Sequence, residues 1–421
     1  MDDQPVLIQR SEHGIARDRF SAAALKVVEG LQAAGHDACV VGGGVRDLLL
    51  GLKPKDFDVA TSATPEQIQK TFRRARLIGR RFRLAHVRFG REVIEVATFR
   101  GQSQDSPDTE HSNGRILRDN TFGSEAEDAV RRDFTLNALM YDPATETVKD
   151  YVGGYRDLKD RSLRLIGDPV TRYREDPVRL LRAARFAVKL DLKIEPATAG
   201  PIPQMASLLT DIPPARLFEE VLKLFMAGQA WPSFRKLVQF GLWDVLFPGL
   251  LDDPAHPGPL IVQALRNTDE RVREGKPVTP AFLFAALLWP RVSEKAALLE
   301  KEGLAPVEAL AEAGEIVLAE QVRQVAIPRR FSGMSKQIWM FQPRFMRMKG
   351  KRVMALLNER RFRAAYDFLL LRALEDPELE PVAQWWTEIQ ELDPEARQKK
   401  VFGRRRKGGG GNRRRRPAGS G

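Results

Sequence analysis

The sequence predicts an α+β protein with a small mixed α/β head, an all-helical neck and body, and a disordered basic C-terminal tail. Helix-like and strand-like segments alternate from Ser21 to about Tyr141, whereas strand signals nearly vanish beyond Asp168 and amphipathic helical windows take over. Residues 401–421 contain eight Lys or Arg residues and no acid. The 421 residues are too many for one small domain, and 43% hydrophobic residues allow a sizeable core.

The elements follow from local signals. Ser21 is the expected N-cap of a helix through Gln32, and Thr64 that of a helix over 65–72. Strands are expected at 38–41, 56–60, 83–89 and 93–99 and helices at 177–189, 215–226, 231–240, 280–289, 354–358 and 362–373. The polar segment 101–122 is expected to be a mobile surface insertion that interrupts the head.

These elements predict five parts: an N-terminal arm (1–20), the head (21–145), a helical neck that binds nucleotide and RNA (146–240), a helical body (241–395) and the tail (396–421). The longest uncharged apolar run, residues 281–289, is far shorter than the roughly 20 residues of a membrane span, so none is expected. The N-terminus lacks the pattern of a signal peptide. A single cysteine excludes an intrachain disulfide and a multi-cysteine zinc site, which predicts a cytoplasmic location.

Charge separates the tail from the body. The formal net charge is +12, and residues 401–421 carry +8 of it. Such a segment is either a solvated end or a flexible tether for a polyanion, and nucleic acid is the leading partner. The candidate RNA-binding residues of the tail are Arg404, Arg405, Arg406, Lys407, Arg413, Arg414, Arg415 and Arg416.

A glycine-rich turn joins the strand at 38–41 to the next helix. It has the sequence Gly42-Gly43-Gly44-Val45-Arg46-Asp47. Glycines let a backbone approach a ligand closely, and helix amides favour phosphate, so a triphosphate fits there. The segment matches neither GxxxxGK[ST] nor GxGxxG, and an ordinary tight turn would also explain it.

Carboxylates follow within the head. Asp56 and Asp58 are two residues apart on an expected strand, so both point to one face, where Mg²⁺ would offset their repulsion. Surface aspartates on a solvated edge are the alternative. Glu95 lies mid-strand among apolar neighbours, where a buried charge needs a metal or partner, and it completes an acidic cluster if the two strands pair. An edge-strand Glu in solvent is its alternative.

Two further groups combine acids with arginines. Asp133 follows Arg131 and Arg132, either as another candidate acid or as part of a helix N-terminus held by salt bridges. Asp176 is the expected N-cap of the helix at 177–189. Asp176, Arg179 and Arg182 lie within an arc of about 120°, and Arg185 is one step further. This stripe is either a solvated helix face or a set of donors and acceptors that reads a nucleobase.

Taken in this order, these motifs resemble the class II tRNA nucleotidyltransferase and bacterial poly(A) polymerase family. The resemblance is strong over residues 38–190 and covers the whole chain in outline. Residues 77–87 and the basic C-terminal extension are similar to the poly(A) polymerase branch. The resemblance implies that the head is a nucleotidyltransferase domain, that Gly43 and Arg46 bind triphosphate, and that Asp56 and Asp58 bind metal.

The family also implies roles for the remaining residues. Arg132, Asp176, Arg179, Arg182 and Arg185 would bind the nucleotide. Asp133 matches a position that this branch treats as catalytic, and the residues leave open whether Asp133 or Glu95 is the working third acid.

The implied activity is template-independent polyadenylation. The 3′-hydroxyl of an mRNA or small RNA attacks the α-phosphorus of ATP and releases pyrophosphate, with two Mg²⁺ ions as cofactors. The expected role is to promote RNA turnover, with RNA-degradation machinery or an RNA chaperone as a partner. Two alternatives are a CCA-adding enzyme and, more distantly, a non-catalytic RNA-binding protein.

Overall fold

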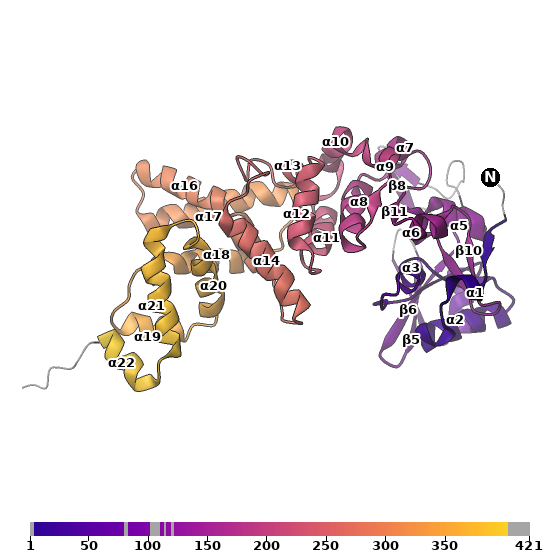
Figure 1. The fold of residues 1–421 in the computed structure, drawn as a ribbon, viewed down its shortest axis with the longest axis horizontal. Helices are drawn as coiled ribbons and strands as arrows, with labels where there is room; N and C mark the ends of the chain where they lie inside the picture. Colours follow the sequence, from indigo (N-terminus) through magenta and orange to yellow (C-terminus); the bar gives the residue numbers. More distant parts are fainter. Residues whose placement is uncertain (1–3, 80–82, 102–109, 113–114, 119–121, 403–421) are drawn as a thin grey trace, which may run out of the picture. The chain divides into compact units, whose positions relative to one another are not determined.

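The structure is a computed structural model, and it describes residues 4–79, 83–101, 110–112, 115–118 and 122–402 (Figure 1). The chain divides into two compact units. The first takes in Met1–Glu220 and Pro232–Leu246, and the second takes in Val221–Trp231 and Phe247–Gly421. In the described part, no helix is long and apolar enough to cross a membrane.

An eight-stranded sheet organises the first unit, in the order β1-β10-β9-β2-β3-β6-β5-β4. β3 and β6 run parallel, and the other neighbouring strands are antiparallel. The strands of this sheet are β1 (Val6–Ile8), β2 (Ala38–Val41), β3 (Asp58–Thr61), β4 (Ala75–Ile78), β5 (Leu84–Phe89), β6 (Glu92–Thr98), β9 (Met140–Asp142) and β10 (Thr147–Asp150). Two small sheets accompany it, formed by β7 (Glu110–Ser112) with β8 (Arg115–Arg118) and by β11 (Ser162–Leu163) with β12 (Lys193–Ile194).

Helices join these strands and follow them in the first unit. They are α1 (Arg10–His13), α2 (Ala22–Ala33), α3 (Gly43–Leu49), α4 (Pro65–Thr71), α5 (Glu125–Arg131), α6 (Gly154–Lys159), α7 (Pro169–Glu175), α8 (Val178–Lys189), α9 (Pro196–Ala199), α10 (Ile202–Met205), α12 (Ala230–Gln239) and α13 (Trp243–Leu246). α11 (Pro214–Phe225) begins in the first unit and ends in the second, and the first two residues of α12 belong to the second unit. The 3₁₀ turns are η1 (Arg17–Arg19), η2 (Thr135–Asn137) and η3 (Ala206–Asp211).

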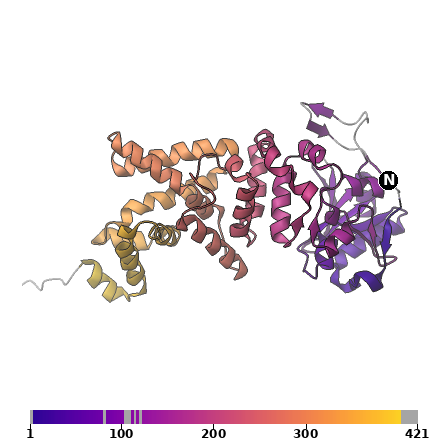
Figure 2. The ribbon, with the colours of Figure 1, turned by 45° about the horizontal axis from the view of Figure 1, so that its top comes forward.

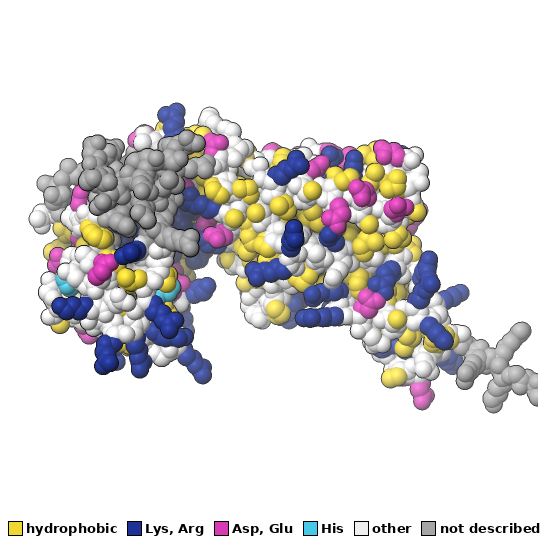
Figure 3. All heavy atoms as spheres, turned by 180° about the vertical axis from the view of Figure 1, so that it is seen from behind, with side chains coloured by type: hydrophobic (Ala, Val, Ile, Leu, Met, Phe, Trp, Pro, Cys, Tyr) yellow, Lys and Arg dark blue, Asp and Glu magenta, His cyan; other side chains and the backbone are white. Residues whose placement is uncertain are grey.

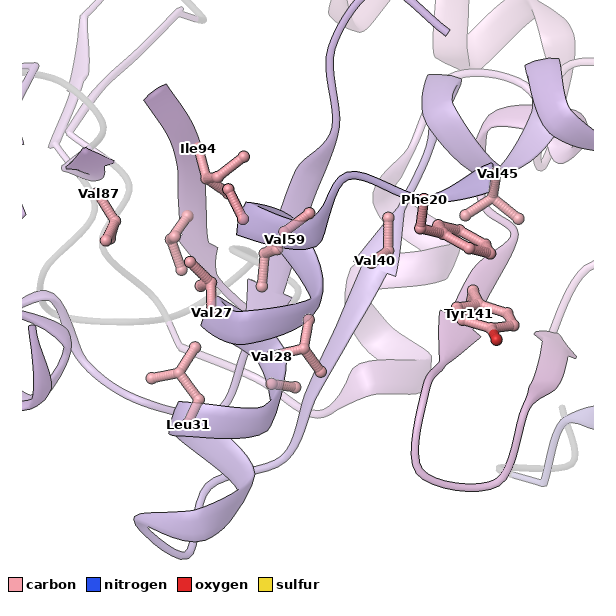
Figure 4. Packing of buried hydrophobic residues seen from close by; sticks show 14 of the residues in the cluster. Phe20, Val27, Val28, Leu31, Val40, Val45, Val59, Val87, Ile94 and Tyr141 are labelled. Atoms are coloured by element: carbon pink, nitrogen blue, oxygen red, sulfur yellow. The ribbon is translucent and has the colours of Figure 1, made fainter. Parts of the chain in front are cut away.

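The main core of this unit lies between one face of the sheet and α2. Val27, Val28 and Leu31 of α2 pack against apolar side chains of the strands, including Val59 and Ile94 (Figure 4). α4 covers the same sheet beside α2, against β4 and β5. Because successive side chains of a strand alternate between faces, the residues next to these core positions point to the other face.

That other face is only partly covered. Near β2 and β9 it carries a second apolar cluster that includes Cys39, Val41 and Met140, together with Ala129 of α5. Towards β6, β5 and β4 it is open, since Asp58, Glu95 and Arg88 are exposed there. The open part of this face therefore holds two of the acidic residues that the sequence predicts for the site.

Helices make up the second unit. They are α14 (Pro259–Arg273), α15 (Pro280–Leu287), α16 (Trp289–Lys301), α17 (Pro306–Gln324), α18 (Arg329–Phe345), α19 (Lys351–Leu357), α20 (Phe362–Arg372), α21 (Glu380–Glu391) and α22 (Pro394–Phe402), with the 3₁₀ turn η4 (Pro377–Leu379). α16 packs on α17, and α18 packs on α15 and α20. One aromatic core joins Phe345, Phe362 and Trp386, whose ring centroids lie 5.1–5.9 Å apart.

Local signals predicted several elements correctly. Ser21 accepts hydrogen bonds from the backbone amides of Ala23 and Ala24, and Thr64 forms a capping box with Gln67. The strand expected at 56–60 begins only at Asp58, so Asp56 lies in the segment that leads into β3. The helix expected at 177–189 is α8, but it begins at Val178 and its N-cap is Pro177, so the expected cap at Asp176 is wrong by one residue. Asp176 is instead the C-cap of α7, and its Oδ1 accepts a 3.3 Å hydrogen bond from the amide of Val178.

The structure corrects three expectations. Residues 396–402, expected in the disordered tail, belong to α22 because Val401 is buried in the aromatic core of the second unit. The insertion at 101–122 contains the β7–β8 hairpin (Figure 2), whose polar sequence lacks an alternating apolar pattern. The sheet also extends past both limits of the head expected at 21–145, because β1 lies before residue 21, β10 lies after residue 145, and the two strands pair. The five-part division itself remains a prediction, and the eight candidate RNA-binding residues at 404–407 and 413–416 lie outside the described residues.

Candidate active site

The glycine turn after β2 is shaped by contacts that exclude larger residues. Gly42 has φ +71° and ψ −128°, a conformation that favours glycine, and a Cβ there would lie 3.2 Å from Nη1 of Arg132. A Cβ on Gly44 would lie 2.8 Å from the ring of Phe57. Gly43 begins α3, and its nearest side chain is that of Arg46. The turn is therefore closely packed against two arginines and one aromatic ring.

Arg46 is buried, and all three nitrogens of its guanidinium group donate hydrogen bonds. The residue is 4% exposed, and its Nε and Nη2 donate to Oδ1 of Asp47 at 2.8 and 2.5 Å. Its Nη1 donates to Oδ1 of Asn137 at 2.5 Å. Asn137 in turn donates from Nδ2 to Oδ1 of Asp133 at 3.0 Å. A buried guanidinium held on both sides keeps a fixed position beside the glycine turn.

The acidic residues meet on the open face of the sheet. The parallel register places Asp58 of β3 directly opposite Glu95 of β6, so the condition under which Glu95 joins the acidic cluster is met. Partial burial and the negative charges of Glu95 and Asp56 raise the pKa of Asp58 to about 6, while Arg132 opposes the shift. The three carboxyl groups therefore share one electrostatic neighbourhood.

Glu95 differs from its expected environment. Its side chain is 47% exposed instead of buried, because the residue points to the open face and its neighbours Ile94 and Val96 point to the core. β6 is also an interior strand, so Glu95 is not on an edge. On its other side, Oε2 of Glu95 lies 3.6 Å from Nε2 of His86 in β5.

These carboxylates fit a hard divalent cation. Among the described residues, no three His, Cys, Asp or Glu side chains stand close enough to form a complete metal cage. Mg²⁺ binds through one or two carboxylates and keeps other positions for water and substrate phosphates, so it does not need such a cage. Mutually repelling carboxyl groups, one with a raised pKa, are a donor set that a cation would stabilise.

Asp133 belongs to a different group from Asp58. Its Oδ2 accepts a hydrogen bond from Nε of Arg182 at 2.6 Å and forms an ion pair with Nη2 at 2.5 Å, and its Oδ1 accepts from the amide of Phe134 at 2.8 Å. Burial opposes ionisation, but the charge of Arg182 and the hydrogen bonds, including that from Asn137, leave the pKa of Asp133 below its ordinary value. Asp133 is thus the counter-ion of Arg182.

Phe186 of α8 is the centre of the arginine cluster, and sequence analysis missed it. The guanidinium carbons of Arg46, Arg182 and Arg185 lie 5.2, 5.1 and 4.4 Å from the centre of its ring. Phe134 packs edge-on against the same ring at 5.6 Å. Three guanidinium groups around one aromatic ring form a site that is partly polar and partly apolar.

Asp176 and Arg179 form a second group at the start of α8. Oδ2 of Asp176 accepts from Nη2 of Arg216 at 2.7 Å, and Nη1 of Arg179 donates to Oε2 of Glu175 at 2.9 Å. Arg185 pairs with Glu220 at 3.3 Å, and Arg132 pairs with Asp128 at 2.8 Å. Sequence spacing did not reveal the partners Arg216 and Glu220, because both come from a distant segment, whereas Glu175 and Asp128 lie four residues from the arginines they pair with.

Comparisons with known proteins identify the family. Three family profiles match: "Poly A polymerase head domain" over residues 38–164, "Probable RNA and SrmB- binding site of polymerase A" over 191–253, and "Polymerase A arginine-rich C-terminus" over 302–419. Poly(A) polymerase I of Salmonella typhi is 52% identical over 401 residues, which cover 92% of this chain and 86% of that protein. The chain belongs to the bacterial poly(A) polymerase I family. Its function is polyadenylation by nucleotidyl transfer, and enzymes of this family use a divalent metal.

Related proteins with another product are more distant. The CCA-adding enzyme of Streptococcus suis is 39% identical over 223 residues, covering 53% of this chain and 54% of that protein. A solved CCA-adding enzyme of Bacillus stearothermophilus in complex with CTP is 26% identical and has a TM-score of 0.57, covering 89% of this chain and 84% of that chain. The Thermotoga maritima enzyme complexed with tRNA is 20% identical, has a TM-score of 0.62 and covers 92% and 87%, which supports the fold alone.

Proposed function

We propose that the chain adds AMP from ATP to RNA 3′ ends without a template, with the chemistry at Asp56, Asp58 and Glu95. The observation that carries this assignment is the register of β3 and β6, which sets Asp58 opposite Glu95. Asp56 lies two residues before Asp58 in the sequence. In the polyadenylating family, such carboxylates are the expected place for nucleotidyl transfer.

Mg²⁺ is the proposed cation, held by Asp56 and Asp58, with Glu95 as the third acid. When bound, it would lower the pKa of the attacking hydroxyl and neutralise charge on the triphosphate. Asp58 must be deprotonated to act as a ligand, and its raised pKa supports a role in which a cation replaces the proton. The proposal favours Glu95 over Asp133 because the charge of Glu95 acts on Asp58, whereas Asp133 is engaged by Arg182.

The basic residues would hold ATP. We assign the triphosphate to the glycine turn beside the acids. The residues assigned are Gly43 of the turn itself and Arg46 and Arg132, which pack against it. Asp176, Arg179, Arg182 and Arg185 would present donors and acceptors to the base, so that the protein takes the place of a template. Asp133 is a positioning residue in this scheme, since its hydrogen bond and ion pair with Arg182 fix the direction of that side chain.

The wider role is proposed from the family and composition. Polyadenylated 3′ ends of mRNA and small RNAs would promote RNA turnover in the cytoplasm, where the buried, free Cys39 stays reduced. RNA-degradation machinery or an RNA chaperone is the proposed partner, and residues 191–253 match a profile described as a probable RNA and SrmB binding site.

Nucleotide incorporation tests this function directly. The protein is incubated with a generic RNA, Mg²⁺ and each nucleoside triphosphate separately, and the products are sized. A ladder of many additions with ATP alone supports polyadenylation, whereas a short product that needs both CTP and ATP would indicate CCA addition. Asp58→Asn should abolish the ladder.

A matched control separates chemistry from surface charge. Asp37→Asn makes the same chemical change just before β2, away from the acidic cluster, and should leave the ladder unchanged. Incorporation by Asp58→Asn at the rate of this control would refute the assignment and favour a non-catalytic RNA-binding protein.

A further inference from the structure

A row of charged side chains crosses four neighbouring strands on the open face of the sheet. The registers set Asp58 of β3 opposite Glu95 of β6, Glu95 opposite His86 of β5, and His86 opposite Arg76 of β4. Neighbouring strands are about 4.8 Å apart, so the row spans about 14 Å. Its charge changes along this distance from acidic to basic.

A pocket of about 580 Å³ opens at the basic end of the row. Four arginines line it: Arg73 and Arg74 from the turn before β4, Arg76 from β4, and Arg88 from β5. Ile78 and Val93 line it as well and are 38% and 43% exposed. In Figure 3, Lys and Arg side chains gather at the lower edge of the head.

The arginines of this pocket differ from those near Phe186. Arg46, Arg182 and Arg185 each have an acidic partner. In contrast, no group within the described residues forms an ion pair or a hydrogen bond with the guanidinium of Arg73, Arg74, Arg76 or Arg88. Four uncompensated like charges around one pocket repel one another, and an anion that enters the pocket relieves this repulsion.

The strand order indicates whether an anion in this pocket belongs to the nucleotide or to the RNA. The glycine turn, Arg46 and Arg132, to which we assign the triphosphate, lie on the β2 side of β3, whereas the pocket lies on the β6 side, across β5 and β4. Asp58 stands between them. In an in-line displacement, the attacking hydroxyl and the leaving pyrophosphate lie on opposite sides of the α-phosphorus, so the primer and the triphosphate approach the acids from different directions.

We propose that this pocket binds backbone phosphates of the RNA primer close to its reacting 3′ end. This inference rests on the proposed function, because it takes Asp58 and Glu95 as the reacting end of the row. Arginine forks match phosphate oxygens, while Ile78 and Val93 offer apolar surface to ribose and base. Such contacts position the primer without selecting its sequence.

RNA binding by a double variant tests the proposal. Arg76→Gln/Arg88→Gln removes two charges from the pocket, and Arg91→Gln/Arg156→Gln removes two from exposed sites outside it. RNA affinity is measured across a salt series without ATP. Neutralising one arginine that binds a phosphate of single-stranded RNA lowers the salt slope by about 0.7, which is about fivefold in affinity at 0.1 M salt. The pocket variant should bind up to about 25-fold more weakly, with a slope lower by about 1.4, and the control should match wild type.

Steady-state kinetics give a second readout. The pocket variant should raise KM for RNA while kcat at saturating RNA and KM for ATP stay near wild type. Arg76→Lys/Arg88→Lys keeps the charges and should recover most of the affinity, which excludes a folding defect as the cause. The salt slope should return because it follows the number of charges, while some affinity stays lost because Lys cannot form the forked contact of Arg.

Two results would overturn the assignment. The first is an affinity and salt slope equal to those of the control double variant. The second is a raised KM for ATP with unchanged RNA affinity, which would give the pocket to the nucleotide. If wild-type protein binds RNA through the pocket but incorporates no AMP from ATP, the proposed function fails and the RNA site stands.

Discussion

Replacing Asp133 by Asn separates a positioning role from a catalytic one. The change removes the counter-ion of Arg182, whose Nε and Nη2 lie 2.6 and 2.5 Å from Oδ2. Breaking a buried pair in this way costs about 3–5 kcal/mol, because one charge stays buried without a partner. The side chains of Asp133 and Arg182 are 12% and 29% exposed, so the lower end, about 3 kcal/mol, applies.

The cost predicts a measurable change in melting temperature. A unit of 150–250 residues shifts by about 2–4 °C per kcal/mol, so Asp133→Asn should lower Tm by about 6–12 °C. The control is Asp160→Asn, since Asp160 pairs with Arg156 at 3.6 Å and both side chains are more than half exposed. Such a pair contributes about 1 kcal/mol or less, and Tm should hardly change.

The pH dependence has a definite sign. The pKa of Asp133 is lowered in the folded protein, so its contribution is present above the ordinary Asp value of 3.8 and is lost as the pH falls through the folded value. The difference in stability between wild type and Asp133→Asn should therefore shrink in acid. Combining Asp133→Asn with Arg182→Gln should cost less than the sum of the single changes. An unchanged Tm together with abolished turnover would refute the positioning role and return Asp133 to the chemistry.

Three further predictions concern other parts of the chain. NMR titration of the metal-free protein should give Asp58 a pKa of about 6, and Glu95→Gln should lower this pKa by removing a negative charge. Because the folded pKa is above the ordinary Asp value of 3.8, the stability of the protein should fall as the pH rises from 3.8 to about 6. Arg179→Ala should reduce the ATP-over-CTP ratio of kcat/KM, by up to about 5- to 150-fold if Arg179 makes a bidentate contact, and an unchanged ratio would place base selection elsewhere. Removing residues 403–421 should weaken RNA binding and flatten its salt slope by at most about 5.6, with single-turnover AMP addition unchanged; parallel slopes would mean a solvated end.

The sequence predicted correctly those elements whose structure depends on contacts between neighbouring residues. The caps Ser21 and Thr64 satisfy amides within three residues, so their signals survive without tertiary structure. β1, β9 and β10 were missed because each has only three or four residues and owes its extended state to neighbours in the sheet. The pairing of β1 with β10 joins segments far apart in the sequence, from Val6 to Asp150.

The candidate site also has residues that the sequence could reveal and residues that it could not. The residue types at Asp56, Asp58 and Arg46 could be singled out from spacing, since the glycine turn and the aspartates follow one another closely. The partners could not, because the contacts of Asn137 and Phe186 with Arg46, and of Asp133 with Arg182, join segments that are far apart in the sequence. A helical stripe predicts which residues share a face but not which acids neutralise it.

The hydrophobic core explains why Asp58 and Glu95 face each other. Ile94 and Val96 alternate with Glu95 and are buried against α2, and a slip of β6 by one residue would turn Glu95 into that core and expose its neighbours. Burying an unpaired carboxylate there would cost several kcal/mol, added to the loss of two apolar side chains from the core. The core on one face therefore fixes the register of the acids on the other. The same register carries His86 and Arg76 into line with them, so the placement of the proposed primer pocket depends on contacts that no substrate touches.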